Sequence, residues 1–157
     1  MTIRFIAMPS GDAAHFRAMG VDAYGMVPER GVADGGGIPC RHCLKDVEPG
    51  EPYLTIAYRP FPALQPYAET GPVFLHAEEC TRAPDGPALP QMLRSSPDYI
   101  VRGYGHDDRI VYGTGGVIAT DAIAERAEDL FERADISYVH VRSARNNCFQ
   151  CRVERAV

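Results

Sequence analysis

TDAIAERAEDLFERA, residues 120–134, is the segment with the clearest structural pattern in the chain. Its apolar side chains recur at intervals of three and four residues, at Ile123, Ala127, Leu130, Phe131 and Ala134. The opposite face of the segment is charged. This period predicts an amphipathic helix that packs its apolar face against a sheet.

Segments on both sides of this helix predict the strands of that sheet. Downstream, residues 137–143 and 148–154 alternate as two strands, and the loop 144–147 between them suits a hairpin. Upstream, strands are expected in segments rich in β-branched and aromatic residues, which are 3–8, 53–58, 72–76, 99–104, 109–112 and 116–119. Gly113 and Gly115 place a turn between the last two.

Two further segments complete the predicted fold. Residues 10–19 suit a short helix, and residues 28–39 predict a loop because they are rich in glycine and poor in apolar side chains. Mostly antiparallel strands with two helices make the fold α+β, an antiparallel sheet packed by one main helix with a loop-rich, zinc-knuckle-like segment. With 157 residues, the chain has the size of a single domain, residues 1–157.

The composition disfavours several classes of partner. The chain has 16 basic and 21 acidic residues, and its net charge of -5 disfavours nucleic acid. No apolar run reaches the length of a membrane span, and Pro9 interrupts the start too early for a signal peptide. We therefore expect a cytoplasmic protein, in which five cysteines argue against a disulfide framework. The sequence identifies no partner and leaves a homo-oligomer open.

Two short motifs supply soft metal ligands, Cys40-x2-Cys43 and His76-x3-Cys80. Zinc prefers four thiolate and imidazole ligands in a tetrahedron, and a C-x2-C turn presents two sulfurs to one ion. Two predicted strands joined by a Pro-rich loop lie between the motifs and would bring them together. We therefore predict one structural zinc site formed by Cys40, Cys43, His76 and Cys80, within a metal-binding segment that spans residues 36–84.

Other roles for these residues stay open. Cys40 and Cys43 would pack as small hydrophobic side chains if His76 only capped a strand through hydrogen bonds. His42, inside the C-x2-C motif, would otherwise replace His76 as a ligand.

A second C-x2-C pair, Cys148 and Cys151, offers an alternative partner for Cys40 and Cys43. Its residues alternate like a strand, in which positions three apart face opposite sides. Phe149, Cys151 and Val153 are therefore expected to face the core together. A redox dithiol at either pair is disfavoured because neither pair begins a helix.

A polar strand face is a second candidate site. Alternation places His140 and Arg142 on one face of their strand, and neighbouring strands add Cys148 and Arg102. These groups match a Cys–His nucleophile with an anion clamp, in which Cys148 and His140 are catalytic and Arg102 and Arg142 bind the substrate. The alternative is the solvated face of an antiparallel sheet with charges arranged for solubility.

Several motifs occur in a specific order along nearly the whole chain. They are Pro39–Leu44, Glu48–Glu51, Ala57–Phe61, Pro66–Glu69, Gly71–Glu78, Cys80, Val139–Arg142 and Cys148–Arg152. In this order the chain resembles a family of small bacterial proteins, the domain of unknown function numbered twelve hundred and three. The resemblance implies one compact domain in which the two ligand pairs belong to a single site. It implies no activity and no catalytic residues.

Three functional hypotheses follow. The one we favour is an uncharacterised cytoplasmic protein that is stabilised by a structural zinc ion and has no assignable activity. The second is a Cys/His-dependent hydrolase or transferase that acts on a small anionic substrate. The third is a protein-interaction module whose Pro-rich loops, residues 60–72 and 81–90, dock a partner.

Overall fold

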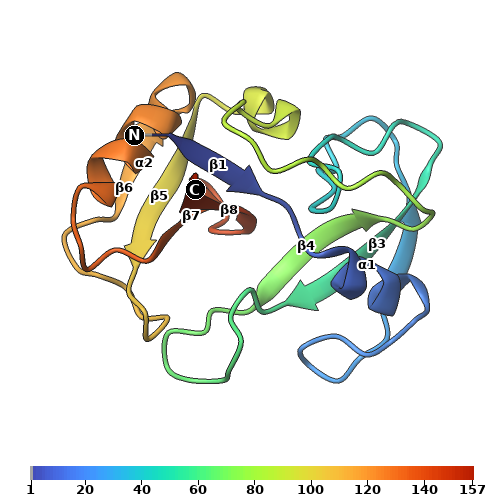
Figure 1. The fold of residues 1–157 in the computed structure, drawn as a ribbon. Coiled ribbons are helices and arrows are strands. Elements are labelled where there is room, and N and C mark those ends of the chain that lie inside the picture. The colour runs from blue at the N-terminus through green and yellow to red at the C-terminus, as the bar shows by residue number, and fades with distance from the viewer. Residues whose placement is uncertain (1) are drawn as a thin grey trace.

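Two antiparallel sheets and two α-helices form residues 2–157, the part of the chain that the computed structural model describes (Figure 1). One sheet has five strands in the order β1-β8-β7-β5-β6, and the other has three in the order β2-β3-β4. The strands are β1 (Ile3–Ile6), β2 (Glu29–Val32), β3 (Pro52–Tyr58), β4 (Gly71–His76), β5 (Asp98–Tyr104), β6 (Gly116–Ala119), β7 (Tyr138–Ser143) and β8 (Phe149–Arg155). The α+β prediction is confirmed.

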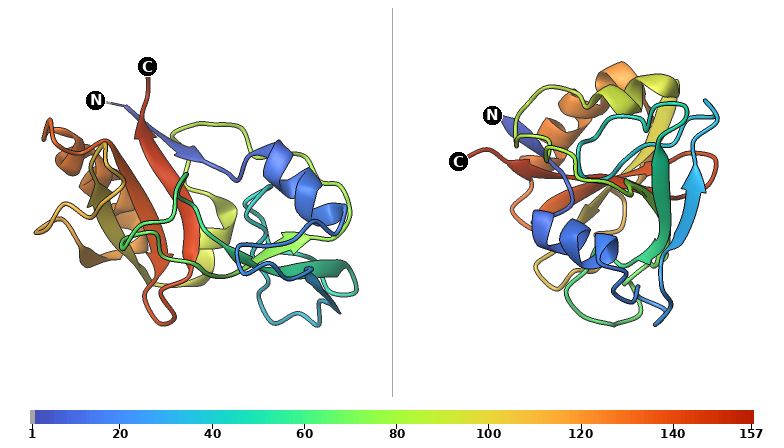
Figure 2. Two further views of the ribbon diagram at one scale, coloured as in Figure 1. Left: turned by 90° about the horizontal axis from the view of Figure 1, so that it is seen from below. Right: turned by 90° about the vertical axis from the view of Figure 1, so that its right-hand side faces the viewer.

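Helix α2 (Ile123–Phe131) covers the side of the five-stranded sheet that faces away from the three-stranded sheet (Figure 1, Figure 2). A 3-10 turn, η2 (Thr120–Ala122), precedes it. The buried side of the helix is the predicted apolar stripe, and it packs in one core with residues of β1, β5, β7 and β8. Arg155 donates hydrogen bonds to the carbonyls of Phe131 and Arg133 at 2.8 Å and 2.9 Å. The helix therefore ends before Ala134, which is exposed.

Helix α1 (Ser10–Arg17) packs with the three-stranded sheet on the other side of the molecule (Figure 2). Its buried residues, Ala13 and Phe16, belong to a second core that contains Leu54 of β3 and Val73 of β4. A 3-10 helix, η1 (Gln91–Ser95), leads the chain back to the first core. No helix of residues 2–157 has the length and apolar character needed to cross a membrane.

The loop predicted for residues 28–39 is wrong in part, because β2 lies within it. β2 is an edge strand that pairs only with β3, where Gly31 lies opposite Tyr53. Most of its side chains are exposed, so no apolar alternation marks it in the sequence. Its place in the sheet comes from backbone hydrogen bonds to β3.

The strand predicted at residues 109–112 is also wrong. Only an isolated bridge joins Ile110 to Tyr104, and β6 pairs with β5 instead. Thr114 holds the segment in place, since its Oγ1 accepts a hydrogen bond from the backbone of Gly103 at 3.0 Å and donates one to the carbonyl of Val111 at 2.6 Å. Hydrogen bonds of one buried side chain thus hold this segment, where the prediction had backbone pairing between strands.

A bulge in the β7–β8 pair changes which side chains share a face. Val141 lies opposite Cys151, but the register then shifts and Arg142 lies opposite Phe149. A bulge of this kind moves a residue to the other face of its strand. Phe149 therefore leaves the face of Cys151 and contacts His140, with 4.8 Å between ring centroids. This corrects the prediction that Phe149 and Cys151 face the same core.

Candidate metal centre

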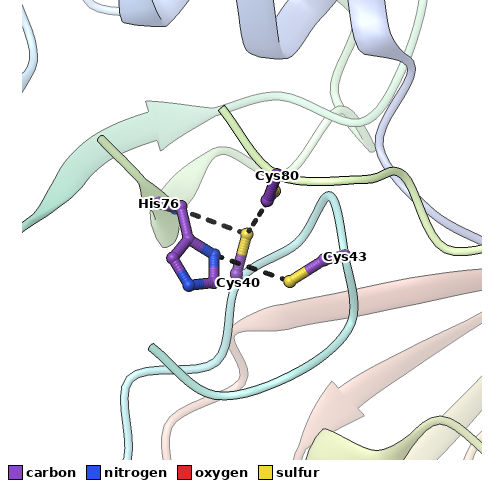
Figure 3. A group of neighbouring side chains, drawn as sticks. All are labelled: Cys40, Cys43, His76 and Cys80. Carbon is purple, nitrogen blue, oxygen red and sulfur yellow. Dashed lines mark hydrogen bonds between the residues drawn. The ribbon is translucent and has the colours of Figure 1, made fainter. Parts of the chain in front are cut away.

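Three thiols and one imidazole meet between the turn that begins at Cys40 and the end of β4 (Figure 3). The ligand atoms of Cys40, Cys43, His76 and Cys80 all lie within 4.8 Å of one another. Figure 3 shows their side chains directed toward one another. The structure thus brings together the four residues that the sequence assigns to one site.

Backbone hydrogen bonds shape the turn that presents the first two sulfurs. The amide of Cys40 donates to the carbonyl of Lys45, and the amide of Leu44 donates to the carbonyl of Cys40, both at 2.9 Å. Leu44 adopts a φ of 58°, which costs a residue with a side chain about 1 kcal/mol. Burial of the Leu44 side chain in the first core offsets this cost. Cys40 and Cys43 consequently project from one tight bend.

Strand β4 and helix α1 position the other two ligands. His76 is the last residue of β4, and its amide donates to Cys40 Sγ at 3.3 Å. Arg17 of α1 donates from Nε to the carbonyl of His76 and from Nη2 to Cys80 Sγ, both at 3.0 Å. One guanidinium group therefore fixes both halves of the second motif.

Two distances within the cluster match the edges of a tetrahedral zinc site. Zn–S bonds of about 2.3 Å and a Zn–N bond of about 2.0 Å place two sulfurs about 3.8 Å apart, and sulfur and nitrogen about 3.5 Å apart. Cys40 Sγ and Cys80 Sγ are 3.9 Å apart, and Cys43 Sγ lies 3.5 Å from His76 Nδ1. These two distances match two edges of such a tetrahedron, and all four ligand atoms lie within 4.8 Å of one another.

Close packing changes the acidity of the three thiols. Hydrogen bonds from the side chains of Cys43 and Cys80 lower the pKa of Cys40 far below its ordinary value. The hydrogen bond with Cys40 in turn raises the pKa of Cys43 and that of Cys80. Cys40, which is fully buried, is thus the first thiolate of the cluster. A divalent cation would favour deprotonation of the other two.

Glu51 and His42 also lie beside the cluster. His76 Nδ1 faces the sulfurs, and its Nε2 lies 3.8 Å from Glu51 Oε1, so Glu51 places a negative charge near the imidazole without a hydrogen bond to it. His42 contacts Cys80 Sγ through Nδ1 at 3.1 Å and Ser10 Oγ through Nε2 at 2.9 Å. His42 therefore borders the cluster, with one ring nitrogen at Cys80 Sγ and the other at Ser10 Oγ. Arg17 contacts the same sulfur.

Sequence reasoning missed Arg17 and Glu51. Arg17 lies in α1, far along the chain from Cys80, and Glu51 lies in the turn before β3. Neither residue type signals a metal site by itself. His42 carried a weak signal through its place inside the C-x2-C motif.

A cavity of about 540 Å³ opens beside the cluster. Cys43, His76 and Cys80 line it, and the last two are partly exposed, whereas Cys40 is closed off from solvent. The cluster is therefore reachable from one side, which gives a metal ion a path of entry.

The second C-x2-C pair lies elsewhere. Cys151 is buried in the first core between the sheet and α2, as expected, and burial raises the pKa of its thiol to about 12. Cys148 lies in the turn before β8, where the nearest partner of its Sγ is the carbonyl of Asn146 at 3.7 Å. Neither cysteine belongs to the metal cluster of residues 2–157.

Arg102, His140 and Arg142 lie near one another in the sheet, and the last two are buried. Arg102 of β5 lies opposite His140 of β7, and Arg142 lies two residues further along β7. His140 and Arg142 are 0% and 3% exposed, so the alternative of a solvated face is wrong for them. Arg102 and Arg142 both contact the carboxylate of Glu69, a residue that sequence reasoning missed.

The proposed nucleophile does not pair with its proposed base. Neither ring nitrogen of His140 has a hydrogen-bond partner within residues 2–157, so Cys148 does not bond to it. Burial lowers the pKa of His140 well below its ordinary value, and the imidazole is neutral. A Cys–His nucleophile needs the two groups within hydrogen-bond reach, and no contact in the structure supports that role for Cys148 and His140.

A comparison with protein families gives one match. The family model described as "Protein of unknown function (DUF1203)" matches residues 37–155, which include both ligand motifs and the strands from β3 to β8. Neither the curated proteins nor the solved structures give a match to the chain. Because the matched range covers more than half of its length, the chain belongs to the DUF1203 family.

Proposed function

We propose that Cys40, Cys43, His76 and Cys80 bind one structural zinc ion that stabilises this fold. The observation that carries the proposal is the spacing of the ligand atoms, which lie within 4.8 Å of one another with edges of 3.9 Å and 3.5 Å. Four protein ligands complete a tetrahedron and leave no position for water, which is typical of structural rather than catalytic zinc.

The donor set and its surroundings favour zinc. Thiolates and imidazole are soft or borderline ligands, which suit zinc and exclude magnesium or calcium, whose ligands are oxygen atoms. Three thiolates and one Zn²⁺ leave a net charge of about −1. The guanidinium of Arg17, whose Nη2 is 3.0 Å from Cys80 Sγ, offsets that charge.

Metal binding would join segments that have little regular secondary structure. The chain before Cys40 is a glycine-rich loop, and the chain after Cys80 is irregular up to η1. One ion would fix both at the end of β4, and Arg17 would extend the link to α1. We propose on this basis a single zinc-stabilised domain.

A cytoplasmic location is part of the proposal. All five cysteines are free, although Cys40 and Cys80 lie close enough for their sulfurs to be 3.9 Å apart. Free thiols that are arranged as metal ligands fit a reducing compartment.

The zinc proposal is tested by metal analysis of protein purified without a metal-affinity tag. We expect about one zinc per chain for the wild type and for Cys148→Ser, whose thiol lies outside the cluster. Cys80→Ser is expected to lose most of the zinc and to unfold at a lower temperature. Less than about half an equivalent of zinc in the wild type, or equal zinc in the two variants, would refute the proposal.

A further inference from the structure

A cavity of about 650 Å³ lies between strands β7 and β8 of the five-stranded sheet on one side and α1 and the end of β3 on the other. None of the four cluster residues lines it. Its wall includes Tyr58 and Phe61 at the end of β3 and beyond, His140 of β7, and Phe149 and Arg152 of β8. This volume falls within the range of small-molecule sites, which are mostly apolar with a few well-placed polar groups.

His140 is the polar group that the protein itself leaves without a partner. Its side chain is 0% exposed, and neither ring nitrogen makes a hydrogen bond within the described chain. The rings of Phe61, Tyr104, Tyr138 and Phe149 surround it, with centroids 4.8 to 5.1 Å away. Buried polar atoms without a partner are rare and costly, so a molecule that reaches His140 from the cavity after the surrounding rings move aside would account for this one.

Arginines make the surroundings of His140 positive. In the sheet register, Arg102 lies opposite His140 on one side and Arg152 lies opposite it on the other, while Arg142 follows two residues later. Glu69 bonds to Arg102. Arg152 uses only Nε, which donates to Glu154 at 2.8 Å, and the structure of residues 2–157 records no hydrogen bond from its two Nη atoms. The free donors therefore favour an anion.

The carboxylates at the cavity are each oriented by hydrogen bonds. Asp12 accepts one from the hydroxyl of Tyr58 at 2.9 Å. Asp22 accepts three from backbone amides, at 2.9, 3.1 and 3.0 Å. Glu154 is shared between Arg152 and Arg4, whose Nη2 is 2.9 Å away. Among residues 2–157, donors of Arg152 and His140 thus remain without a protein acceptor at the cavity.

We propose that this cavity binds a small aromatic carboxylate. Its ring packs among Tyr58, Phe61 and Phe149, and its carboxylate accepts hydrogen bonds from the Nη atoms of Arg152 and from one N–H of His140. A neutral imidazole always carries one such N–H, and a guanidinium group binds a carboxylate through two parallel bonds. The proposal is independent of the zinc site, since the two groups of residues do not overlap.

Nuclear magnetic resonance of the full chain labelled with ¹⁵N-histidine tests the proposal. The chain has five histidines, and the ring signals of His140 report directly on the cavity. Benzoate is the probe, with benzamide as its neutral counterpart, benzylammonium as its cationic counterpart and acetate as a carboxylate without a ring. Benzoate is expected to shift the His140 signals with a saturable dependence on concentration and to bind at least about tenfold more tightly than each comparison compound.

A pair of arginine variants separates the carboxylate contact from general charge. Arg152→Gln is expected to weaken benzoate binding about tenfold or more, whereas Arg145→Gln, an exposed site paired with Asp98, is expected to bind as the wild type does. The zinc content of both variants is expected to be unchanged. Absence of a saturable shift, equal binding of benzylammonium or acetate, or full affinity in Arg152→Gln would each overturn the proposal.

Discussion

The buried imidazole of His140 makes the stability of this protein depend on pH. Burial lowers its pKa well below the ordinary value, and the nearby guanidinium groups of Arg142, Arg152 and Arg102 lower it further. The folded protein therefore keeps this ring neutral while the unfolded chain takes up a proton near pH 6.5. Since protons then bind preferentially to the unfolded chain, acid destabilises the fold.

We expect the free energy of unfolding to fall below about pH 6.5, with His140 contributing about 1.4 kcal/mol per pH unit until its folded-state pKa is reached. His140→Phe removes this contribution and should make the pH dependence shallower. His106→Gln is the control, because His106 is exposed. Urea unfolding of zinc-loaded proteins at several pH values measures the slopes. Equal slopes for His140→Phe and the wild type would contradict the assignment.

At the scale of elements, Arg41 links the turn that carries Cys40 and Cys43 to both sheets. It is 2% exposed, and its guanidinium donates from Nε to the carbonyl of Phe149 at 2.7 Å and from Nη1 to that of Pro39 at 2.6 Å. Its amide donates to the carbonyl of Phe74 in β4, and its carbonyl accepts from Met8. Although burial lowers the pKa of Arg41 to about 10, the side chain stays charged at neutral pH.

Arg41→Met keeps the length of the side chain but leaves two buried carbonyls without these donors. We expect it to lower the free energy of unfolding by about 2–3 kcal/mol. Arg94→Met, at an exposed position of η1, is the matched control and should change it by less than about 0.5 kcal/mol. Denaturant unfolding measures both. A loss no larger than that of the control would show that Arg41 does not couple the turn to β8.

The elements with apolar periodicity were predictable from the sequence. The stripe of α2 and the strands of the C-terminal hairpin were identified because their apolar side chains recur with a regular period. β2 was missed because an exposed edge strand needs no apolar side chains. The bulge beside Arg142 was missed because it depends on pairing with another strand, and for that reason Phe149 was assigned to the wrong face.

The ligands of the candidate site were predictable from the sequence, but the residues around them were not. The ligands of the cluster were found because metal chemistry restricts them to a few residue types at short spacings. Arg17 and Glu51 were not found, since their contacts depend on how α1 and β3 pack around the cluster. The pairing of His140 with Cys148 was inferred from strand alternation alone, and Cys148 lies in the turn before the strand begins.

At the scale of the whole molecule, the Cys/His cluster belongs to the core of the three-stranded sheet, and the turn that carries Cys40 and Cys43 also contacts the five-stranded sheet through Leu44 and Arg41. The four ligands come from one turn and from the end of β4, Arg17 reaches them from α1, and Arg41 connects the same turn to β8. A metal ion here would therefore stabilise both sheets together. Removal of the ion with a chelator is expected to lower the unfolding temperature of the whole protein in a single transition.

X-ray absorption at the zinc edge, on protein purified without a metal-affinity tag, tests the metal site most directly. The account predicts about one zinc per chain, with three sulfur neighbours at about 2.3 Å and one nitrogen neighbour at about 2.0 Å. Protein without zinc, or zinc surrounded mainly by oxygen, would contradict it.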